Sequence, residues 1–452
     1  MASFEQCLKY SLDNCPLFKE KKITLKEKQI ETLRALYEDH DCVSVLPTGY
    51  GKSVIFQLLP WFCQLKMEKR KPMSVIVVSP LNSLIQDQVI AMRKKGLNAC
   101  SLNFTGTHGS TYEDADCEND EEQDHEYVEI DVPFEQLERG DFCMIYCHPE
   151  ALLKTRFSRL LRSQLYQEII CAVVIDEVHM VSEWGEEFRP AFQKLGELMC
   201  ILEKALHLIL TATATPKSIA SLAKELNLKN PLVISENVDR PNIFIDIRNR
   251  LPNIHKFDKF DDLIEPVATE LLEKGVHFPV TIMYVESLEA LSYFYQFLSY
   301  KLKGASYDGE EIPQNRIYAQ YHKDYAESMK KIIIQELTKE TPKVRLVLAT
   351  VALGMGLNAP SVSRIIHCRP PTTLEKYLQE IGRAGRVGQP SVAILYYNKN
   401  DIAKNRIGMT EEMRKFCESE TCYRIILVNY FGFESVVFSG PKEHCCSICS
   451  RK

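Results

Sequence analysis

The chain has 452 residues, of which 45% are hydrophobic and 26% charged, and its formal net charge is −6. This composition is typical of a soluble globular protein and allows two to four domains of about 100–200 residues each. No apolar run reaches the ~20 residues of a membrane-spanning helix, and the first residues lack the apolar core of a secretion signal.

The first informative stretch combines a helix, a strand and a glycine-rich turn. Thr24 and Glu27 predict a capped helix that ends at Tyr37, and an apolar strand is expected at residues 42–46. A second helix is expected at residues 53–62. Between that strand and that helix lies the run Leu46-Pro47-Thr48-Gly49-Tyr50-Gly51-Lys52-Ser53. A glycine-rich turn in this context is typical of a phosphate-binding loop.

The residues of this loop suit a bound triphosphate. Gly49 and Gly51 let backbone N–H groups point at phosphate oxygens, and the dipole of the following helix favours an anion. Lys52 would reach the β- and γ-phosphates, and the Ser53 hydroxyl would hold Mg²⁺. The general pattern requires glycine at position 46, where this chain has Leu46. The alternative is an ordinary glycine-rich turn before a helix.

An acidic stretch separates the next two expected strands, at residues 74–79 and 142–147. Glu113 to Asp131 contains eleven carboxylates and neither lysine nor arginine, and without them the formal charge of −6 becomes +5. We interpret residues 104–133 as a solvated insertion into the domain. The functional alternative is that this acidic segment mimics nucleic acid and occupies a basic groove. The positive remainder of the chain is compatible with a nucleic-acid partner.

Two carboxylates follow a continuous apolar strand. Residues 169–175 are all apolar, as in a strand buried on both faces of a parallel sheet, and Asp176-Glu177-Val178-His179 come next. The carboxyl ends of such strands are where open α/β sheets bind ligands. Asp176 would anchor Mg²⁺, and Glu177 would deprotonate the attacking water. An isolated pair of this kind would more simply be a solvated strand end.

Strands and helices alternate through the rest of the chain. Further strands are expected at residues 206–211, 280–285, 316–320, 344–349, 364–368 and 392–397, and helices at 263–274, 288–302, 325–339 and 374–381. This alternation predicts an α/β fold in which mainly parallel sheets carry helices on both faces. The phosphate loop occurs once, and a joint between two halves is expected near residues 235–252.

Clustered cysteines near the end of the chain predict a metal site. The set is Cys422, Cys445, Cys446 and Cys449. Four thiolates suit tetrahedral Zn²⁺, and because protein would fill every position we expect the metal to be structural. Cys417 and His444 are alternative ligands. The remaining cysteines are scattered, and we expect them to be reduced and buried in an intracellular enzyme.

The order of these motifs resembles that of superfamily 2 helicases. Thr-Gly-x-Gly-Lys-Ser, Asp-Glu-x-His, Thr-Ala-Thr and Gln-x-x-Gly-Arg-x-x-Arg follow one another along the chain. The details are similar to the RecQ family of DNA helicases: residues 25–29 match its adenine motif, 77–88 its motif Ia and 182–190 its aromatic-rich loop. The resemblance runs from about Leu25 to Cys449. It implies two RecA-like domains and a small C-terminal helical zinc-binding subdomain.

The resemblance assigns roles around the nucleotide, with ATP, Mg²⁺ and Zn²⁺ as implied cofactors. Gln29 would recognise adenine, and His179 would belong to the catalytic motif of Asp176 and Glu177. Gln379, Arg383 and Arg386 would come from the second domain, the arginines to the γ-phosphate. Their spacing of three predicts one shared helix face, from which a guanidinium would stabilise the transition state. Hydrolysis would then require a closed cleft, and its opening and closing would produce translocation.

A further set of residues is expected to bind DNA. Exposed aromatic side chains such as Trp184 and Phe188 stack on unpaired bases, which is worth ~1–3 kcal/mol per base. The alternative for this pair is packing in a core. The family's motifs Ia and V add contacts to the DNA backbone. The full set is Ser79, Pro80, Trp184, Phe188, Arg189 and Thr350.

The chain departs from the family pattern in several places. Val178 stands where alanine is usual, His148 stands where small residues are common, and the acidic insertion is foreign to the family core. Three residues follow Cys449, so we expect neither the winged helix nor the further helical domain of many RecQ-like proteins. A truncated product of a longer helicase is the other interpretation.

We therefore predict a DNA-stimulated ATPase that moves 3′ to 5′ on single-stranded DNA and unwinds tailed or forked duplexes. One alternative is an RNA-directed helicase. Another is an ATP-gated clamp or adaptor that binds nucleic acid without unwinding it. The expected domains are residues 1–238, 239–398 and 399–452. A nuclear location is expected from the substrate alone.

Overall fold

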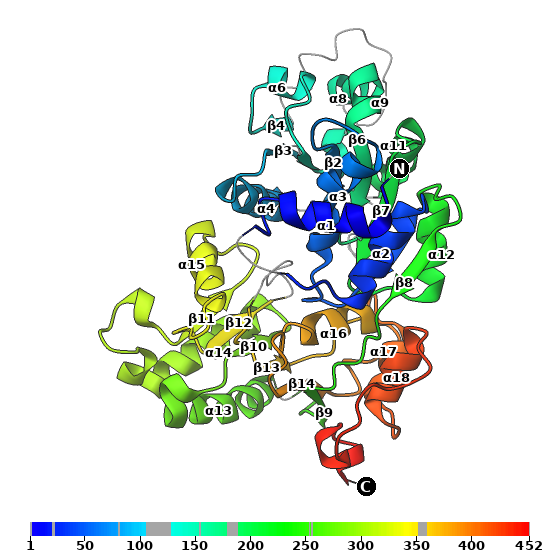
Figure 1. Cartoon of the computed structure of the whole chain (residues 1–452). Coiled ribbons are helices and arrows are strands. Elements are labelled where there is room, and N and C mark those ends of the chain that lie inside the picture. The colour runs from blue at the N-terminus through cyan, green and yellow to red at the C-terminus, as the bar shows by residue number, and fades with distance from the viewer. Residues whose placement is uncertain are drawn as a thin grey trace. The chain divides into compact units, whose positions relative to one another are not determined.

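The computed structural model describes residues 2–19, 23–79, 82–104, 128–152, 155–178, 189–252, 254, 256–350 and 359–451. The chain forms two compact units, Met1–Glu236 and Asn237–Lys452 (Figure 1). The separation lies within residues 235–252, and a further boundary before residue 399 stays a prediction. In the ranges described, no helix combines the length and the apolar character needed to cross a bilayer.

The first unit is built on an eight-stranded sheet with the order β4-β3-β5-β2-β6-β7-β1-β8. Every neighbouring pair is parallel except β3 with β4. The strands are β1 Cys42–Val45, β2 Ser74–Val78, β3 Ala99–Phe104, β4 Val128–Ile130, β5 Met144–Cys147, β6 Ile170–Ile175, β7 Leu206–Thr211 and β8 Leu232–Ser235.

Helices cover both faces of this sheet. They are α1 Phe4–Asn14, α2 Glu27–Tyr37, α3 Lys52–Lys66, α4 Asn82–Lys94, α6 Phe134–Glu138, α7 Pro149–Leu152, α8 Thr155–Arg162, α9 Gln164–Ile169, α11 Arg189–Ile201 and α12 Pro216–Glu225. Alternate side chains of a strand point to opposite faces, so Val75 and Val77 of β2 join the core under α1–α4. Ile76 and Val78 join the core under the later helices.

The acidic region is shorter than the sequence suggested. Leu102 to Phe104 of β3 pair with Val128 to Ile130 of β4, and α6 begins at Phe134. The prediction of a solvated insertion up to residue 133 was therefore wrong at this end, because Val128 and Ile130 extend the sheet. Asp131 is also structural, since its carboxylate accepts the Ser101 N–H at 2.8 Å. Residues 105–127 lie outside the described ranges.

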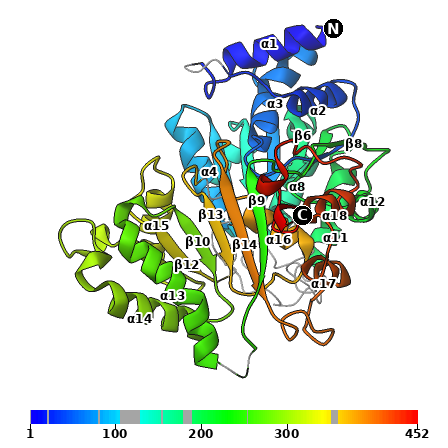
Figure 2. The ribbon, with the colours of Figure 1, turned by 90° about the horizontal axis from the view of Figure 1, so that it is seen from below.

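The second unit has a six-stranded sheet with the order β11-β12-β10-β13-β14-β9, and every neighbouring pair is parallel (Figure 2). The strands are β9 Ile243–Asn249, β10 Thr281–Tyr284, β11 Tyr318–Tyr321, β12 Leu346–Ala349, β13 Arg364–His367 and β14 Ser391–Tyr397. Together with the first sheet, this confirms the predicted α/β class with mainly parallel sheets. β9 was not expected, because it lies in the segment that was interpreted as the joint.

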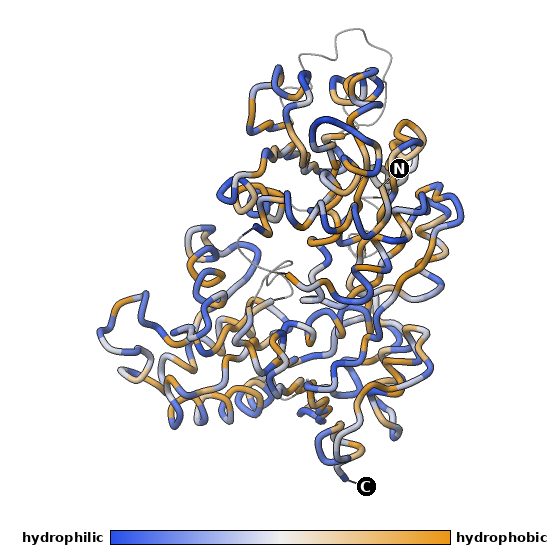
Figure 3. The backbone as a smooth tube through the Cα atoms, viewed as in Figure 1, coloured by the Kyte–Doolittle hydropathy of each residue, from blue (hydrophilic) through white to orange (hydrophobic). Residues whose placement is uncertain are grey.

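The helices of the second unit are α13 Lys256–Lys274, α14 Leu288–Leu302, α15 Glu327–Leu337, α16 Leu374–Ile381, α17 Glu411–Cys417 and α18 Tyr423–Tyr430. Short 3₁₀ turns lie at Gly275–His277, Lys303–Ser306, Pro313–Asn315, Lys442–His444 and Cys449–Arg451. Figure 3 shows hydrophobic and hydrophilic stretches alternating along α13 and its neighbours, as expected for helices that cover a sheet with one face. The helix expected from residue 263 begins at Lys256 instead.

The last segment of the chain packs along the edge strand β9. Ile245 forms a parallel bridge with Cys446, and the Ser447 N–H donates to the Ile245 carbonyl at 2.9 Å. The Ile247 N–H donates to the Ser447 hydroxyl at 3.2 Å. Phe416 and Leu427, from α17 and α18, join the core formed by β9, β14 and α16. An exposed edge invites unwanted strand pairing, and this segment covers it.

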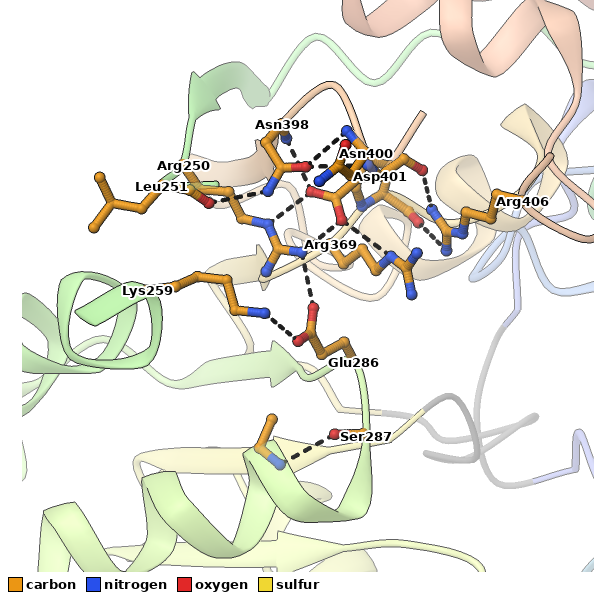
Figure 4. A network of polar contacts seen from close by, with 12 residues as sticks. Arg250, Leu251, Lys259, Glu286, Ser287, Arg369, Asn398, Asn400, Asp401 and Arg406 are labelled. Atoms are coloured by element: carbon orange, nitrogen blue, oxygen red, sulfur yellow. Dashed lines mark hydrogen bonds and ion pairs between the residues drawn. The ribbon is translucent and has the colours of Figure 1, made fainter. Parts of the chain in front are cut away.

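A buried polar network joins the carboxyl ends of three strands in the second unit (Figure 4). Arg250 follows β9 and donates from Nε and Nη2 to Asp401, which follows β14, at 2.7 and 2.5 Å. The same Nη2 reaches Glu286, after β10, at 2.8 Å. Lys259 of α13 donates to the other oxygen of Glu286 at 2.6 Å. Asp401 also accepts the Asn398 N–H at 2.9 Å, so both of its oxygens are used.

Two further arginines give this network an excess of positive charge. Arg369 Nε lies 3.2 Å from Asp401 Oδ1. Arg406 donates to the backbone carbonyls of Asp401 and Pro370 at 2.7 and 2.9 Å. Burial, and then repulsion by Arg369, lower the pKa of Arg406 to about 10. Asp401 is fully buried, so its charge is what holds these cations together.

Candidate functional site

The predicted phosphate loop connects the buried strand β1 to α3. Gly49 and Gly51 have φ angles of 83° and 92°, which favour glycine. Gly51 caps α3, and Lys52 is its first residue, with 9% of its surface exposed. Ser53 follows in the first turn, half-buried, and Thr48 is half-buried before the two glycines. This is the strand–turn–helix context that the sequence pattern requires.

Gln29, the residue expected to recognise adenine, is tied to this loop. Its amide Nε2 donates to the carbonyls of Gly51 at 2.9 Å and Tyr50 at 3.2 Å. Its Oε1 accepts the Lys26 N–H at 2.8 Å, which caps α2. The helix therefore begins at Glu27, and the predicted cap at Thr24 was wrong, because Gln29 supplies the capping acceptor. A Cβ on Gly51 would lie 2.8 Å from Gln29 Nε2, so glycine is needed for this approach.

The two expected carboxylates follow β6 directly. Asp176 is 4% exposed, and its N–H donates to the Val78 carbonyl at 2.9 Å. Its Oδ1 accepts the Glu177 N–H at 2.9 Å. Glu177 has a φ of 54°, in the left-handed region that is rare for residues other than glycine. Strained backbone of this kind occurs most often at functional sites, where surrounding contacts hold it.

Lys52 and the two carboxylates form one electrostatic group. Lys52 Nζ lies 3.7 Å from Glu177 Oε1. Burial, and then the neighbouring Glu177 carboxylate, raise the pKa of Asp176 above its ordinary range, while Lys52 opposes them. Two adjacent carboxylates with one nearby ammonium suit a site that takes up a divalent cation, because the cation would relieve their repulsion. The hydroxyl and carboxylate oxygens of Ser53 and Asp176 are ligands that Mg²⁺ prefers.

The residues expected to bind DNA are only partly described. Ser79 follows β2, is 2% exposed, and has a hydroxyl without a hydrogen-bond partner among the described residues. Thr350 follows β12, and its N–H donates to the Tyr321 carbonyl at 3.1 Å. Arg189 begins α11. Pro80, Trp184 and Phe188 lie outside the described residues, as does His179 of the expected catalytic motif. The roles of all these residues stay predictions.

The two arginines of the second unit do not share a helix face. α16 contains Gln379, but it ends at Ile381 with Gly382 as its cap, so Arg383 and Arg386 follow in turns. The predicted helical placement was therefore wrong. Gly385, which has a φ of 65°, then turns the chain between the two arginines.

Sequence reasoning missed the residues that hold this turn. Arg240 Nη2 donates to the carbonyls of Ala384 at 3.2 Å and Gly385 at 2.8 Å. Asn242 Nδ2 donates to the Gly385 carbonyl at 2.9 Å and would lie 2.2 Å from a Cβ there. Burial lowers the pKa of Arg240. The run Arg240-Pro241-Asn242 was interpreted only as a break between domains, because no local pattern marks these long-range donors.

A buried stack lies beside Arg383. The Tyr284 and His367 rings are stacked, with centroids 5.1 Å apart and planes 16° from parallel. His367 Nε2 lies 2.8 Å from Glu380 Oε2, on the last turn of α16. Burial raises the pKa of Tyr284 to about 12, and Arg383 opposes this effect. The stack connects the ends of β10 and β13 to α16 and fixes where the turn with Arg383 begins.

The four expected zinc ligands meet in space. Their sulfur atoms all lie within 4.8 Å of one another, in a group formed by Cys422, Cys445, Cys446 and Cys449. Cys422 Sγ lies 3.7 Å from Cys445 Sγ and 3.9 Å from Cys446 Sγ. A tetrahedron with Zn–S bonds of about 2.3 Å has edges of about 3.8 Å, so these thiols fit zinc. Cys417 and His444 are not in this group of described residues.

Arg424 connects the cysteine cluster to the start of the second unit. Its Nε donates to the Cys445 carbonyl at 3.2 Å, and its Nη1 donates to Asp239 Oδ1 at 2.6 Å and the Arg240 carbonyl at 3.0 Å. It also donates to the Ile243 carbonyl. Only 1% of this arginine is exposed. Local sequence patterns do not reveal its role, because Asp239, Arg240 and Ile243 lie more than 180 residues away along the chain.

Comparisons with known proteins agree with this architecture. The DEAD/DEAH box helicase family model matches residues 26–222, and the helicase conserved C-terminal domain model matches residues 280–388. The chain is 28% identical to the ATP-dependent DNA helicase RecQ of Haemophilus influenzae, over 90% of this chain and 59% of that protein. It therefore spans less than two thirds of that relative's length.

Solved helicase structures share the fold. The helicase MrfA bound to DNA and AMPPNP superposes with a TM-score of 0.62 at 16% identity, over 86% of this chain and 50% of that one. The DEAD-box helicase Mss116 bound to single-stranded RNA superposes with a TM-score of 0.61 at 15% identity, over 92% of this chain and 82% of that one. At these identities the likeness shows the fold of two RecA-like domains and no more. From the matching models and relatives, the chain belongs to the RecQ family of superfamily 2 helicases.

Proposed function

We propose that this chain is an ATP-dependent DNA helicase that moves 3′ to 5′ along single-stranded DNA. The proposal rests on one observation above all: Lys52 begins a helix after a glycine-rich loop and lies 3.7 Å from Glu177, in a chain of this family. Lys52 would bind the β- and γ-phosphates of ATP, which take the place of Glu177 as its partner. Glu177 is then released to orient the attacking water.

The remaining residues have supporting roles in this proposal. Ser53 and Asp176 would hold Mg²⁺, which when bound would neutralise charge on the β- and γ-phosphate oxygens. Gln29 would recognise the base. Arg383 and Arg386 would stabilise charge on the γ-phosphate in the transition state, with Arg240 and Asn242 holding their turn in place.

A strand-displacement experiment tests the function. The protein is given ATP and a duplex with a single-stranded tail at either the 3′ or the 5′ end, made of DNA or of RNA. We expect release of the strand from the 3′-tailed DNA duplex and stimulation of ATP hydrolysis by single-stranded DNA. ATP consumption without strand release would identify a clamp or adaptor, and preference for RNA would identify an RNA-directed enzyme.

The variant Glu177→Gln should bind ATP but fail to turn it over. Glutamine keeps the shape of the side chain and removes the base, which is worth about 10²–10⁴-fold in rate. It also removes a negative charge beside Lys52, so the affinity for ATP should not fall. Calorimetric titration with ATP and single-turnover hydrolysis measure the two effects separately. Unchanged hydrolysis would exclude Glu177 as the base.

We further propose that the cysteine cluster holds structural Zn²⁺. The supporting observations are four thiols within 4.8 Å of one another and two sulfur–sulfur distances near that of a zinc tetrahedron.

Removing the metal should destabilise the second unit. Cys446 pairs with the edge strand β9, and Arg424 joins the Cys445 carbonyl to the start of the unit, so the loss would spread beyond the cluster. Elemental analysis should find zinc in the purified protein, and Cys449→Ser should lower its content. Cys200→Ser, at an exposed thiol outside the cluster, is the control. Full stability after complete removal of the metal would contradict a structural role.

A further inference from the structure

Tyr50 places a large side chain in the middle of the phosphate loop. It lies between Gly49 and Gly51, both of which have positive φ angles, and its ring is half-buried. Loop backbone that approaches phosphate needs small residues, and an aromatic side chain there must be accommodated elsewhere. The contacts of Tyr50 show where it is accommodated.

Two side-chain contacts and one backbone hydrogen bond of Tyr50 involve residues 26–29, in the segment expected to recognise the base. The Tyr50 hydroxyl accepts the Lys28 N–H at 3.4 Å. The Lys26 ammonium lies over the ring, 4.4 Å from its centroid. The Tyr50 carbonyl accepts from Gln29 Nε2 at 3.2 Å. The side chain and the backbone of one loop residue thus hold three of the four residues of this segment.

The Tyr50 hydroxyl also faces Glu236, the last residue of the first unit. Burial, and then the Glu236 carboxylate, raise the pKa of Tyr50 to about 12. Glu236 follows β8, and its N–H donates to the Val45 carbonyl at 3.0 Å, at the end of the strand that leads into the loop. The hydroxyl therefore accepts from Lys28, with the Glu236 carboxylate nearby.

Gln29 has no amide hydrogen to spare in this arrangement. Both Nε2 hydrogens are used by the carbonyls of Tyr50 and Gly51. A base that accepts a hydrogen bond from this amide must replace at least one of these bonds, which would loosen the segment from the loop. The contacts of the Tyr50 side chain with Lys26 and Lys28 do not involve the Gln29 amide, so they persist when Gln29 turns to the base.

We propose that Tyr50 is a positioning residue that keeps the base-recognition segment attached to the phosphate loop while Gln29 binds the base of a nucleoside triphosphate. The proposal rests on the proposed ATP site. It implies that Tyr50 contributes to the affinity for a triphosphate that carries a base, and not to the affinity for the phosphates alone.

The test compares two ligands in the presence of Mg²⁺: ATP and inorganic tripolyphosphate, which has no base. Tyr50→Phe removes only the hydroxyl and should weaken ATP binding about fivefold, the size of one ordinary hydrogen bond, with tripolyphosphate binding unchanged. Tyr37→Phe is the matched control. Tyr37 is the last residue of α2, and its hydroxyl donates to the Ala2 carbonyl at 2.8 Å, away from the loop. It should change neither affinity.

A second variant, Glu236→Gln, shows whether the hydroxyl acts together with the carboxylate. We expect the loss from the double variant to be no larger than the greater single loss, since both variants change the surroundings of one hydroxyl. The proposal would be overturned if Tyr50→Phe weakened the binding of ATP and of tripolyphosphate equally, or weakened neither. It would also be overturned if the losses of ATP affinity in the two single variants simply added in the double variant. The proposed function fails on a different result, namely no hydrolysis of ATP by the unaltered protein.

Discussion

Replacing Lys52 by alanine should abolish ATP hydrolysis, the largest effect on activity that we expect from one substitution. Loss of a preorganised charge at a reacting phosphate costs about 10²–10³-fold in rate, and Lys52 has two tasks. It would bind the transferred phosphate, and it opposes the repulsion between Asp176 and Glu177. Without it the pKa of Asp176 should rise further, so protons would compete more strongly with Mg²⁺. Steady-state hydrolysis at saturating Mg²⁺ measures the combined loss.

The chain offers a matched control at the other end of the same helix. Lys66 is as buried as Lys52, with 9% of its side chain exposed, and it also pairs with a carboxylate, Asp39 at 2.5 Å. Lys66→Ala should cost similar stability and leave the turnover number unchanged. If both variants lose activity in proportion to a fall in melting temperature, Lys52 acts through the fold and not through the phosphate.

The sequence sufficed for the parts of the site that are local. A strand, a glycine-rich turn and a helix are consecutive, so the position of Lys52 follows from the chain itself. Asp176 and Glu177 directly follow an apolar strand, and parallel strands present their carboxyl ends at one edge of the sheet. Local order and that one rule predict that these residues lie close together.

Interactions between distant segments could not be predicted in this way. Arg240 holds a turn 145 residues later, and Arg250 binds Asp401 across 151 residues, with no spacing rule to mark either pair. Strand β9 was missed for a related reason. It contains Asp246, Arg248 and Asn249 among its apolar residues, since it lies at the edge of its sheet. Its edge is covered by a segment from the far end of the chain, which local patterns do not reveal.

Asp401→Asn should be the most destabilising single substitution in the second unit, by about 3–5 kcal/mol. Asparagine has nearly the same shape, but it removes the charge that both Arg250 nitrogens and Arg369 approach. Glu286 would remain as the one carboxylate of the network, and it is already shared by Lys259 and Arg250. Taking ions out of water is costly, so cations that stay buried without their partner destabilise the folded state strongly.

Both tryptophans, Trp61 and Trp184, belong to the first unit, which lets urea unfolding separate the two units. Tryptophan fluorescence follows the first unit, and far-ultraviolet circular dichroism follows both. In Asp401→Asn the dichroism signal should begin to fall at a lower urea concentration than in the unaltered protein. The fluorescence transition should stay at the same urea concentration.

Two further variants test whether loss of the buried Asp401 charge causes the destabilisation in Asp401→Asn. Glu411→Gln breaks an exposed pair with Lys415 in the same unit and should leave its stability nearly unchanged, because water already screens that pair. Arg250→Met combined with Asp401→Leu removes a cation together with its carboxylate, and it should recover part of the stability lost in Asp401→Asn. If Asp401→Asn costs no more than Glu411→Gln, the network in Figure 4 does not hold the carboxyl ends of these strands together.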